Sequence, residues 1–229
     1  MTFRTHAAHE TPAERRAHDA DVLVARARAG DPTAFDGLVR RFRPRIYAVA
    51  LHLTGSASDA DDIAQEAFVQ AYRQMGKFEG RSQFFTWLYR ITVNGALNAQ
   101  RLRVRRASVA LDDVRVEAAL AVDAPNDPRL AISLRETYST LLSALDGLSP
   151  GLKSAVVLTA LSGLSYEEAA VVLGTSAGAV AVRIHEARKQ LRAALLASEK
   201  VRGRAPQKSD ERQESTPSLE LAMSLAALL

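Results

Sequence analysis

Apolar residues recur along this chain with the spacing of amphipathic helices, and alternating strand patterns are nearly absent. Asp31 and Pro32 suit a helix N-cap and first turn, and Gly55 suits the end of the helix that follows. The apolar stripe of this helix comprises Phe35, Leu38, Val39, Phe42, Ile46, Val49 and Leu53. The pattern predicts an all-α protein.

Two further helices are predicted in the first half of the chain. Ser58 and Asp61 form a capping pair that opens the first of them, and a loop over residues 76–80 follows it. Its inward positions are Ala64, Ala67, Phe68, Ala71, Tyr72 and Met75. The other helix runs from Ser82 to about Arg106. The residues that it buries are Phe84, Leu88, Ile91 and Gly95.

A segment with two prolines, scattered acidic residues and no sustained apolar stripe separates two helical units. We therefore expect two small helical domains with separate cores, joined by a flexible acidic linker. The tail over residues 198–229 begins with a charged stretch that is poor in large apolar residues, so we expect disorder there. A short leucine-rich helix is expected at its end. The expected boundaries are 1–22 for a polar extension, 23–106 and 131–197 for the domains, 107–130 for the linker and 198–229 for the tail.

Composition excludes several classes of protein. The 229 residues include no cysteine, which rules out disulfides, cysteine-ligated zinc, iron–sulfur clusters and a thiol nucleophile. No apolar run approaches the ~18–20 residues of a membrane span, and the polar start lacks a signal-peptide core, so we expect a cytoplasmic protein. The sequence has no phosphate-cradling glycine loop, serine elbow or metal cluster, so we expect no catalysis, no cofactor and no metal.

Charge is strongly segregated along the chain, although the net charge is only +4 and the sequence pI is about 9.6. Residues 56–79 hold five acidic and two basic side chains, and residues 107–129 hold the same numbers. Between them, residues 81–106 hold six arginines and no acidic residue. An acid-free basic block that is also rich in aromatic residues favours a nucleic-acid surface over a merely solvated helix.

One face of the predicted helix over 82–106 combines the groups that an unpaired nucleic-acid strand requires. The aligned positions are Trp87, Asn94, Asn98, Arg101 and Arg105, at offsets 0, 7, 11, 14 and 18. An aromatic ring can stack on a base, amides can bind base edges, and arginines can neutralise phosphates. Arg81 and Phe85 lie at the start of the same helix. The alternative is that the aromatic residues belong to the core.

The second unit contains the spacing of a helix-turn-helix. Ser165 and Glu168 form a capping box, Gly174 ends the short helix, and Ala170 and Val180 supply the small and apolar contacts between the two helices. The inward positions of the second helix are Val180, Ile184, Ala187, Leu191 and Leu195. Its exposed face carries Arg183, His185, Arg188, Lys189 and Arg192, which suit phosphates and base edges. A helical hairpin with no role in DNA binding is the alternative.

Three segments together resemble the extracytoplasmic-function (ECF) group of bacterial RNA polymerase sigma factors. Residues 59–68 (DADDIAQEAF) and 84–91 (FFTWLYRI), with Asn94, are similar to the second conserved region of that family. Residues 164–170 (LSYEEAA), with the turn and helix that follow, are similar to the fourth. The resemblance covers roughly residues 30–106 and 137–196, and two motifs across a linker are more specific than one.

The resemblance implies a division of labour along the chain. Docking on the clamp helices of the RNA polymerase β′ subunit is implied for Asp59, Asp62, Gln65 and Glu66. Melting and holding the −10 promoter element is implied for Arg81, Phe85, Trp87, Asn94, Asn98 and Arg101. Recognition of the −35 element, with the second domain on the β flap, is implied for Ser165, Arg183, His185 and Arg188. The acidic linker would pass through the polymerase channel, and an anti-sigma factor is a possible partner.

The recognition helix departs from the family pattern, because Ala179, Ala181, Val182 and Glu186 stand where polar or basic residues are usual. A glutamate among phosphates is repulsive, so we predict weak or unusual −35 recognition, with DNA shape or the −10 element contributing more. Two other functions stay open: a stand-alone helix-turn-helix regulator, and a sigma-like adaptor or decoy that no longer reads promoters. The tail residues Leu219, Met223 and Leu228 are candidates for docking on the protein itself or on a partner.

Overall fold

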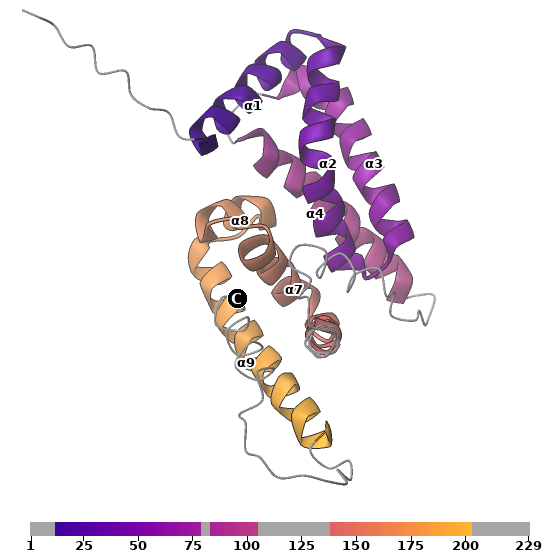
Figure 1. Cartoon of the computed structure of the whole chain (residues 1–229), viewed down its shortest axis with the longest axis vertical. Coiled ribbons are helices and arrows are strands. Elements are labelled where there is room, and N and C mark those ends of the chain that lie inside the picture. The colour runs from indigo at the N-terminus through magenta and orange to yellow at the C-terminus, as the bar shows by residue number, and fades with distance from the viewer. Residues whose placement is uncertain (1–11, 79–82, 105–137, 203–229) are drawn as a thin grey trace, which may run out of the picture.

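The computed structural model describes residues 12–78, 83–104 and 138–202, and the regular elements within these ranges are all helical (Figure 1). The all-α prediction is therefore confirmed. The N-terminal unit consists of α1 (Pro12–Arg28), α2 (Pro32–Thr54), α3 (Ala57–Gln74), the 3-10 turn η1 (Met75–Lys77) and α4 (Phe84–Val104). Helix α2 lies at its centre and packs against α1, α3 and α4.

Helix α2 begins and ends at the residues that its sequence predicts. The Asp31 side chain accepts hydrogen bonds from the backbone N–H groups of Thr33 at 2.9 Å and Ala34 at 3.2 Å. Gly55 ends the helix with a φ of +73°, a left-handed conformation that glycine adopts at little cost. Six of the seven predicted stripe residues are buried, and Val39 is half-buried.

Helix α3 differs from its prediction in two places. Its N-cap is Ser56, whose Oγ accepts from the backbone N–H of Asp59 at 3.3 Å, and Ser58 lies within the first turn. Ser56 takes this role because its backbone is still extended directly after Gly55. Tyr72 was predicted to point inward but is 57% exposed, and its ring meets the edge of Phe35 at 5.0 Å between centroids.

The C-terminal unit comprises a helical segment over residues 138–146, α7 (Pro150–Val156), a π-helical turn η2 (Val157–Leu161), α8 (Tyr166–Leu173) and α9 (Ala177–Arg202). Helix α9 packs against α7 and α8. All five inward positions predicted for the recognition helix are buried on α9. Helix α9 continues beyond residue 197 and α1 starts within 1–22, so both helices cross the expected domain boundaries. The expected linker lies outside the described residues.

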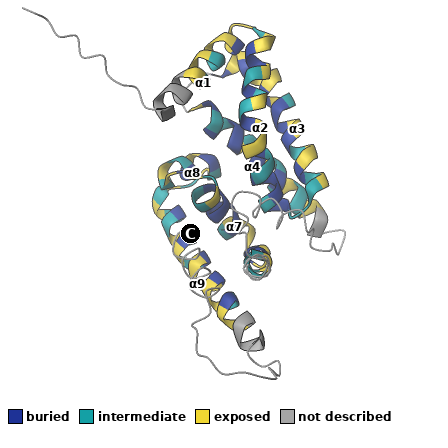
Figure 2. Ribbon diagram, in the orientation of Figure 1, coloured by how far each residue is buried: buried dark blue, intermediate teal, exposed yellow. Residues whose placement is uncertain are grey.

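The two units pack against each other, with α4 on α8 and α2 on α7 and η2 (Figures 1 and 2). Buried residues of both units belong to one continuous hydrophobic cluster, which includes Leu38 and Leu88 of the first unit and Val156 and Ile184 of the second. The prediction of two small helical domains is confirmed, and in this arrangement their cores are in contact. Burial of apolar surface between the units favours a single merged core.

Candidate nucleic-acid interface

A groove of about 820 Å³ runs between α3 and α4 in the N-terminal unit. Helix α3 lines it with Asp62, Glu66 and Gln70. Helix α4 lines the opposite side with aromatic, amide and basic side chains, which are Trp87, Arg90, Asn94, Asn98 and Arg101. The groove therefore offers a stacking surface, hydrogen-bonding amides and guanidinium groups along one helix, and carboxylates along the other.

The structure brings together four of the six residues implied in −10 binding. Trp87, Asn94, Asn98 and Arg101 all line the groove, because spacings of 7, 11 and 14 residues return to nearly the same side of an α-helix. Phe85 does not line it and instead makes an edge-on contact with Tyr89, at 5.9 Å between ring centroids. Arg81 lies outside the described residues.

Trp87 joins the groove to the hydrophobic core. Its ring is half-buried and lies 5.1 Å from the ring of Phe78 and 5.8 Å from that of Phe84, centroid to centroid. Phe78 is buried even though it lies in the predicted loop over residues 76–80. The signal that could have found Phe78 is a large aromatic residue shortly before a helix with an aromatic start. Core support on one side of the Trp87 ring fixes the orientation of its exposed part.

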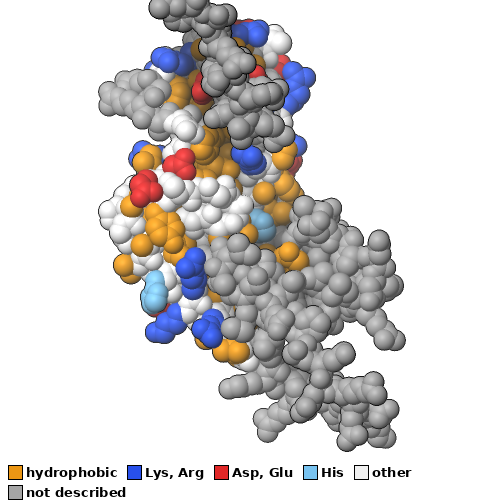
Figure 3. Space-filling view, turned by 60° about the vertical axis from the view of Figure 1, so that its left-hand side comes forward, with side chains coloured by type: hydrophobic (Ala, Val, Ile, Leu, Met, Phe, Trp, Pro, Cys, Tyr) orange, Lys and Arg blue, Asp and Glu red, His pale blue; other side chains and the backbone are white. Residues whose placement is uncertain are grey.

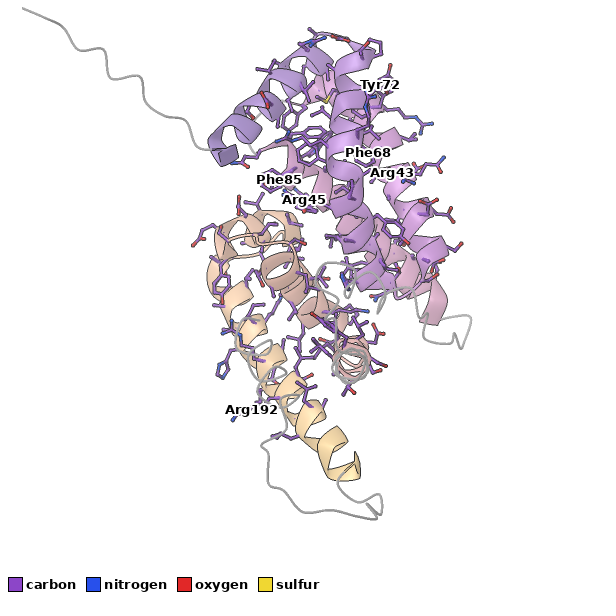
Figure 4. The ribbon with its side chains drawn as sticks, in the orientation of Figure 1. Arg43, Arg45, Phe68, Tyr72, Phe85 and Arg192 are labelled. Carbon is purple, nitrogen blue, oxygen red and sulfur yellow. The ribbon has the colours of Figure 1, made fainter. Side chains whose placement is uncertain are left out.

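The acidic residues of α3 divide into two groups. Asp62 and Glu66 are exposed, line the groove, and take part in no ion pair within the described part of the chain. Asp61, between them and the helix start, pairs instead with Arg43 of α2 at 2.7 Å. Asp59 and Gln65 do not line the groove, and Gln65 is exposed. Figure 4 shows Arg43 reaching outward from α2 toward solvent on the side of α3.

The opposite side of α4 faces the C-terminal unit. Figure 4 shows Phe85 and Arg45 at the edge of the N-terminal unit that faces α8. The neighbouring Tyr89 is buried, and this burial raises its pKa, while the nearby charge of Arg45 and the Ser162 side chain act in the opposite direction. Ser162 follows η2, so this tyrosine connects the two units. Helix α4 therefore has one side in the groove and another in the contact between units.

The helix-turn-helix of the second unit is built from the predicted contacts. The Ser165 Oγ accepts from the Glu168 backbone N–H at 3.1 Å, and the Ser165 backbone N–H donates to Glu168 Oε2 at 2.8 Å. Gly174 adopts a φ of +62° in the turn. Ala170 and Val180 are buried where α8 packs on α9. The capping box and the turn are confirmed.

The exposed surface of α9 is less uniform than its sequence suggests. His185, Arg188 and Arg192 lie on one flank at spacings of three and four residues, and Arg192 points into solvent (Figure 4). Arg183 lies on the other flank with Glu186, whose Oε1 accepts from Gln190 Nε2 at 2.9 Å. Val182 lies between the flanks and is 69% exposed. Basic and histidine side chains gather toward the lower left of Figure 3, on the C-terminal unit.

Neither a metal site nor a membrane span is found in the part of the chain that the structure describes. No group of three or more His, Asp or Glu side chains there is arranged to hold a metal ion. None of the described helices is both long and apolar enough to cross a bilayer.

Two family profiles match the chain, one over each unit. Sigma-70 region 2 matches residues 38–107, and Sigma-70 region 4 matches residues 138–191. The RNA polymerase sigma-H factor of Pseudomonas aeruginosa is 37% identical over 177 residues, which cover 76% of this chain and 92% of that protein. This chain belongs to the ECF sigma factor family. The ECF RNA polymerase sigma-E factor of Escherichia coli is 36% identical over 174 residues, covering 74% of this chain and 91% of that one.

Two solved structures share the fold. CnrH, solved in complex with the cytosolic domain of CnrY, matches with a TM-score of 0.60 and 32% identity over 78% of this chain and 98% of CnrH. RpoE of Bartonella quintana, solved with the anti-sigma factor NepR, matches with a TM-score of 0.55 and 25% identity over 70% of this chain and 96% of RpoE. Sigma factors are non-enzymatic initiation factors, so family membership agrees with the expectation of no catalysis.

Proposed function

We propose that this ECF sigma factor binds core RNA polymerase in the cytoplasm and directs it to promoters, where it opens the −10 element. The observation that carries the proposal is the alignment of Trp87, Asn94, Asn98 and Arg101 along one groove, within the region 2 match. Stacking, amide hydrogen bonds and phosphate neutralisation are the three interactions that hold an unpaired strand. Phe85 and Arg81 are assigned to the same element by position in the family motif.

Docking on the β′ clamp helices is assigned to α3. Asp62, Gln65 and Glu66 are exposed there, and Asp59 is half-buried near the helix start. Three carboxylates on one helix form an acidic surface that attracts a basic partner. Because Asp62 and Glu66 also line the groove, polymerase docking and strand capture would take place on adjoining surfaces.

Recognition of the −35 element is assigned to the start of α8 and to α9, through Ser165, Arg183, His185 and Arg188, with the unit resting on the β flap. The Ser165 hydroxyl accepts its capping bond and can still donate to a phosphate. Exposed Val182 and the carboxylate of Glu186 weaken this surface, so the −10 contacts would carry more of the specificity.

An anti-sigma factor is the second partner that we propose. CnrH and RpoE of Bartonella quintana were each solved in a complex, and the RpoE partner is named as an anti-sigma factor. The family matches cover both units of this chain, so an anti-sigma factor would have a surface on each unit available for binding.

The function is tested by adding the protein to sigma-free core RNA polymerase and measuring transcripts on a library of promoter fragments. We expect initiation at a defined promoter class. Trp87→Ala should reduce open-complex formation by about 1–3 kcal/mol because base stacking is lost. The variant also loses packing against Phe78 and Phe84, so unchanged core binding is the control that the domain is still folded. Arg101→Ala should also reduce it, whereas Arg28→Ala, which removes an exposed arginine at the end of α1, should not.

The other outcomes identify the alternatives. Binding to core without DNA opening would support an adaptor or decoy. Binding to duplex DNA without any affinity for core would support a stand-alone helix-turn-helix regulator.

A further inference from the structure

An apolar side chain lies at the centre of the exposed face of α9. Val182 is 69% exposed, the highest fraction among the large hydrophobic side chains that are exposed in the described chain. It lies opposite the buried side of the helix, because Val180 and Ile184 are buried two residues to either side and two residues turn an α-helix by about 200°. Packing within the described chain leaves most of this side chain uncovered, so Val182 is available to a partner.

Basic side chains flank Val182 on both sides of the same helix. Arg183 follows it by one residue, which is a rotation of about 100°, and Arg192 follows it by ten, which is about 80° in the opposite sense. His185 and Arg188 lie on the flank of Arg192, which points into solvent (Figure 4). None of these four side chains takes part in an ion pair between described residues. The surface therefore has an apolar centre between two basic flanks.

The carboxylate on this surface is directed along its own helix. Glu186 is half-buried, and its Oε1 accepts a hydrogen bond from Gln190 Nε2 at 2.9 Å. Gln190 lies four residues after Glu186, whereas Val182 lies four residues before it. The hydrogen bond therefore draws the negative charge toward the following turn of α9 and away from Val182.

The helix-turn-helix determines which part of duplex DNA this surface would meet. In this motif the first turns of the second helix enter the major groove, which has phosphates along its two edges and base edges on its floor. The first turn of α9 is capped, since Ser176 Oγ accepts from the backbone N–H of Ala179 at 3.2 Å, and Val182 follows about one turn later. The basic flanks therefore suit the phosphates, and Val182 suits the base edges.

The floor of the major groove has one apolar feature. Guanine, adenine and cytosine present hydrogen-bond donors and acceptors there, whereas thymine also presents its C5 methyl group. The two methyl groups of Val182 neither donate nor accept a hydrogen bond, so they gain stability only by covering another apolar group. The thymine methyl is the group that they match.

We propose that Val182 contacts the methyl group of thymine, so that this sigma factor selects −35 elements with a thymine at the centre of the contact. The proposal rests on the proposed function, and it names the base that the second unit prefers. Burial of one methyl group corresponds to about a fourfold preference for thymine over a base that lacks the methyl. This preference is separate from the overall affinity, which depends on the phosphate contacts.

Deoxyuridine tests the proposal, because it lacks the C5 methyl group but keeps the hydrogen-bonding groups of thymine. Duplexes are first selected from a random library with the full-length protein bound to core polymerase. Each thymine of a selected −35 element is then replaced by deoxyuridine, and the dissociation constant is measured with the parent protein, Val182→Ala and Val22→Ala. Val22→Ala is the matched control, at an exposed valine of α1. Alanine favours a helix, so Val182→Ala keeps the fold of α9.

We expect deoxyuridine at one or two positions to weaken binding about fourfold in the parent and in Val22→Ala, and less than about twofold in Val182→Ala. No effect of deoxyuridine at any position in the parent would overturn the proposal. An equal effect in the parent and in Val182→Ala would also overturn it, because the missing methyl would then act through DNA shape.

Transcript initiation on the same fragments separates this inference from the proposed function. Initiation without any effect of deoxyuridine would overturn the thymine contact and leave the sigma factor function standing. If no fragment supports initiation, the proposed function is contradicted. The same substitutions, measured with the full-length protein alone at low salt, where phosphate contacts are strongest, then decide the thymine contact. Failure to bind any duplex under those conditions would overturn it as well.

Discussion

Single side chains on α4 have different roles that depend on which side of the helix they occupy. Trp87 rests on Phe78 and Phe84 and lines the groove with its exposed part. Tyr89, two residues further on, is buried against the other unit. Two residues along an α-helix turn the side chain by about 200°, so the two aromatic rings serve opposite surfaces.

The raised pKa of Tyr89 predicts how the free energy of unfolding changes at alkaline pH. Burial raises the pKa of Tyr89 above the ordinary value of 10.0, so the unfolded chain ionises first as the pH rises. The stability that Tyr89 contributes is complete below pH 10 and is lost above it, with a slope of up to about 1.4 kcal/mol per pH unit. We expect the free energy of unfolding, measured with denaturant between pH 8 and pH 11, to fall less in Tyr89→Phe than in the parent protein.

Tyr72→Phe is the control for this prediction, because Tyr72 is 57% exposed. It should lose stability with pH as the parent does. Equal slopes for Tyr89→Phe and the parent would show that ionisation of Tyr89 does not oppose folding.

At the scale of elements, the helix-turn-helix has the expected caps and turn, but its basic side chains are unevenly distributed over α9. The capping box at Ser165 and the left-handed Gly174 define α8 and the turn. On α9, exposed Val182 separates the flank of His185 and Arg188 from that of Arg183. The element is therefore shaped to enter a DNA groove but offers few charges at the centre of its face.

Val182→Arg should strengthen DNA binding by the second unit. An added guanidinium can neutralise one phosphate and release its counterions, which steepens the slope of log K against log salt by about 0.9. Binding of the full-length protein with core polymerase to a −35-containing fragment, measured over a salt series, checks this. Ala197→Arg adds the same charge at an exposed position farther along α9 and should change the slope less. Equal effects of the two variants would count against a DNA contact at position 182.

At the scale of the whole molecule, the merged hydrophobic cluster makes the two units depend on each other. Helices α7, η2 and α8 lie between α9 and the N-terminal unit (Figures 1 and 2). The chain has a single tryptophan, Trp87, so its fluorescence reports the N-terminal unit alone.

A destabilising substitution in the core of the second unit should therefore lower the denaturation midpoint that Trp87 fluorescence reports. Leu191→Ala on α9 removes a buried side chain at a cost of about 2–5 kcal/mol. If the units unfold together, the denaturation midpoint followed by Trp87 fluorescence falls with the midpoint followed by circular dichroism. Leu196→Ala, at an exposed leucine of the same helix, should move neither midpoint appreciably. If Leu191→Ala leaves the denaturation midpoint followed by Trp87 fluorescence unchanged, the two units unfold independently.

Much of the candidate site could be predicted from the sequence because it lies on one helix. The spacing of Trp87, Asn94, Asn98 and Arg101 is converted to a shared side by helix geometry alone. Their meeting with Asp62 and Glu66 across a groove depends on the packing of α3 on α4, which spacing does not encode. The assignment of these residues to polymerase and promoter remains a prediction.

Local interactions let the sequence by itself determine both ends of α2 and the end of α8, since Asp31, Gly55 and Gly174 act on backbone groups a few residues away. Only the tertiary structure decided that the two cores merge. The contact that fastens them joins Lys153 to Leu53, 100 residues apart in the chain. No periodic pattern marks such a pair, because its stability comes from burial and from a helix-end carbonyl that becomes available only when the units meet.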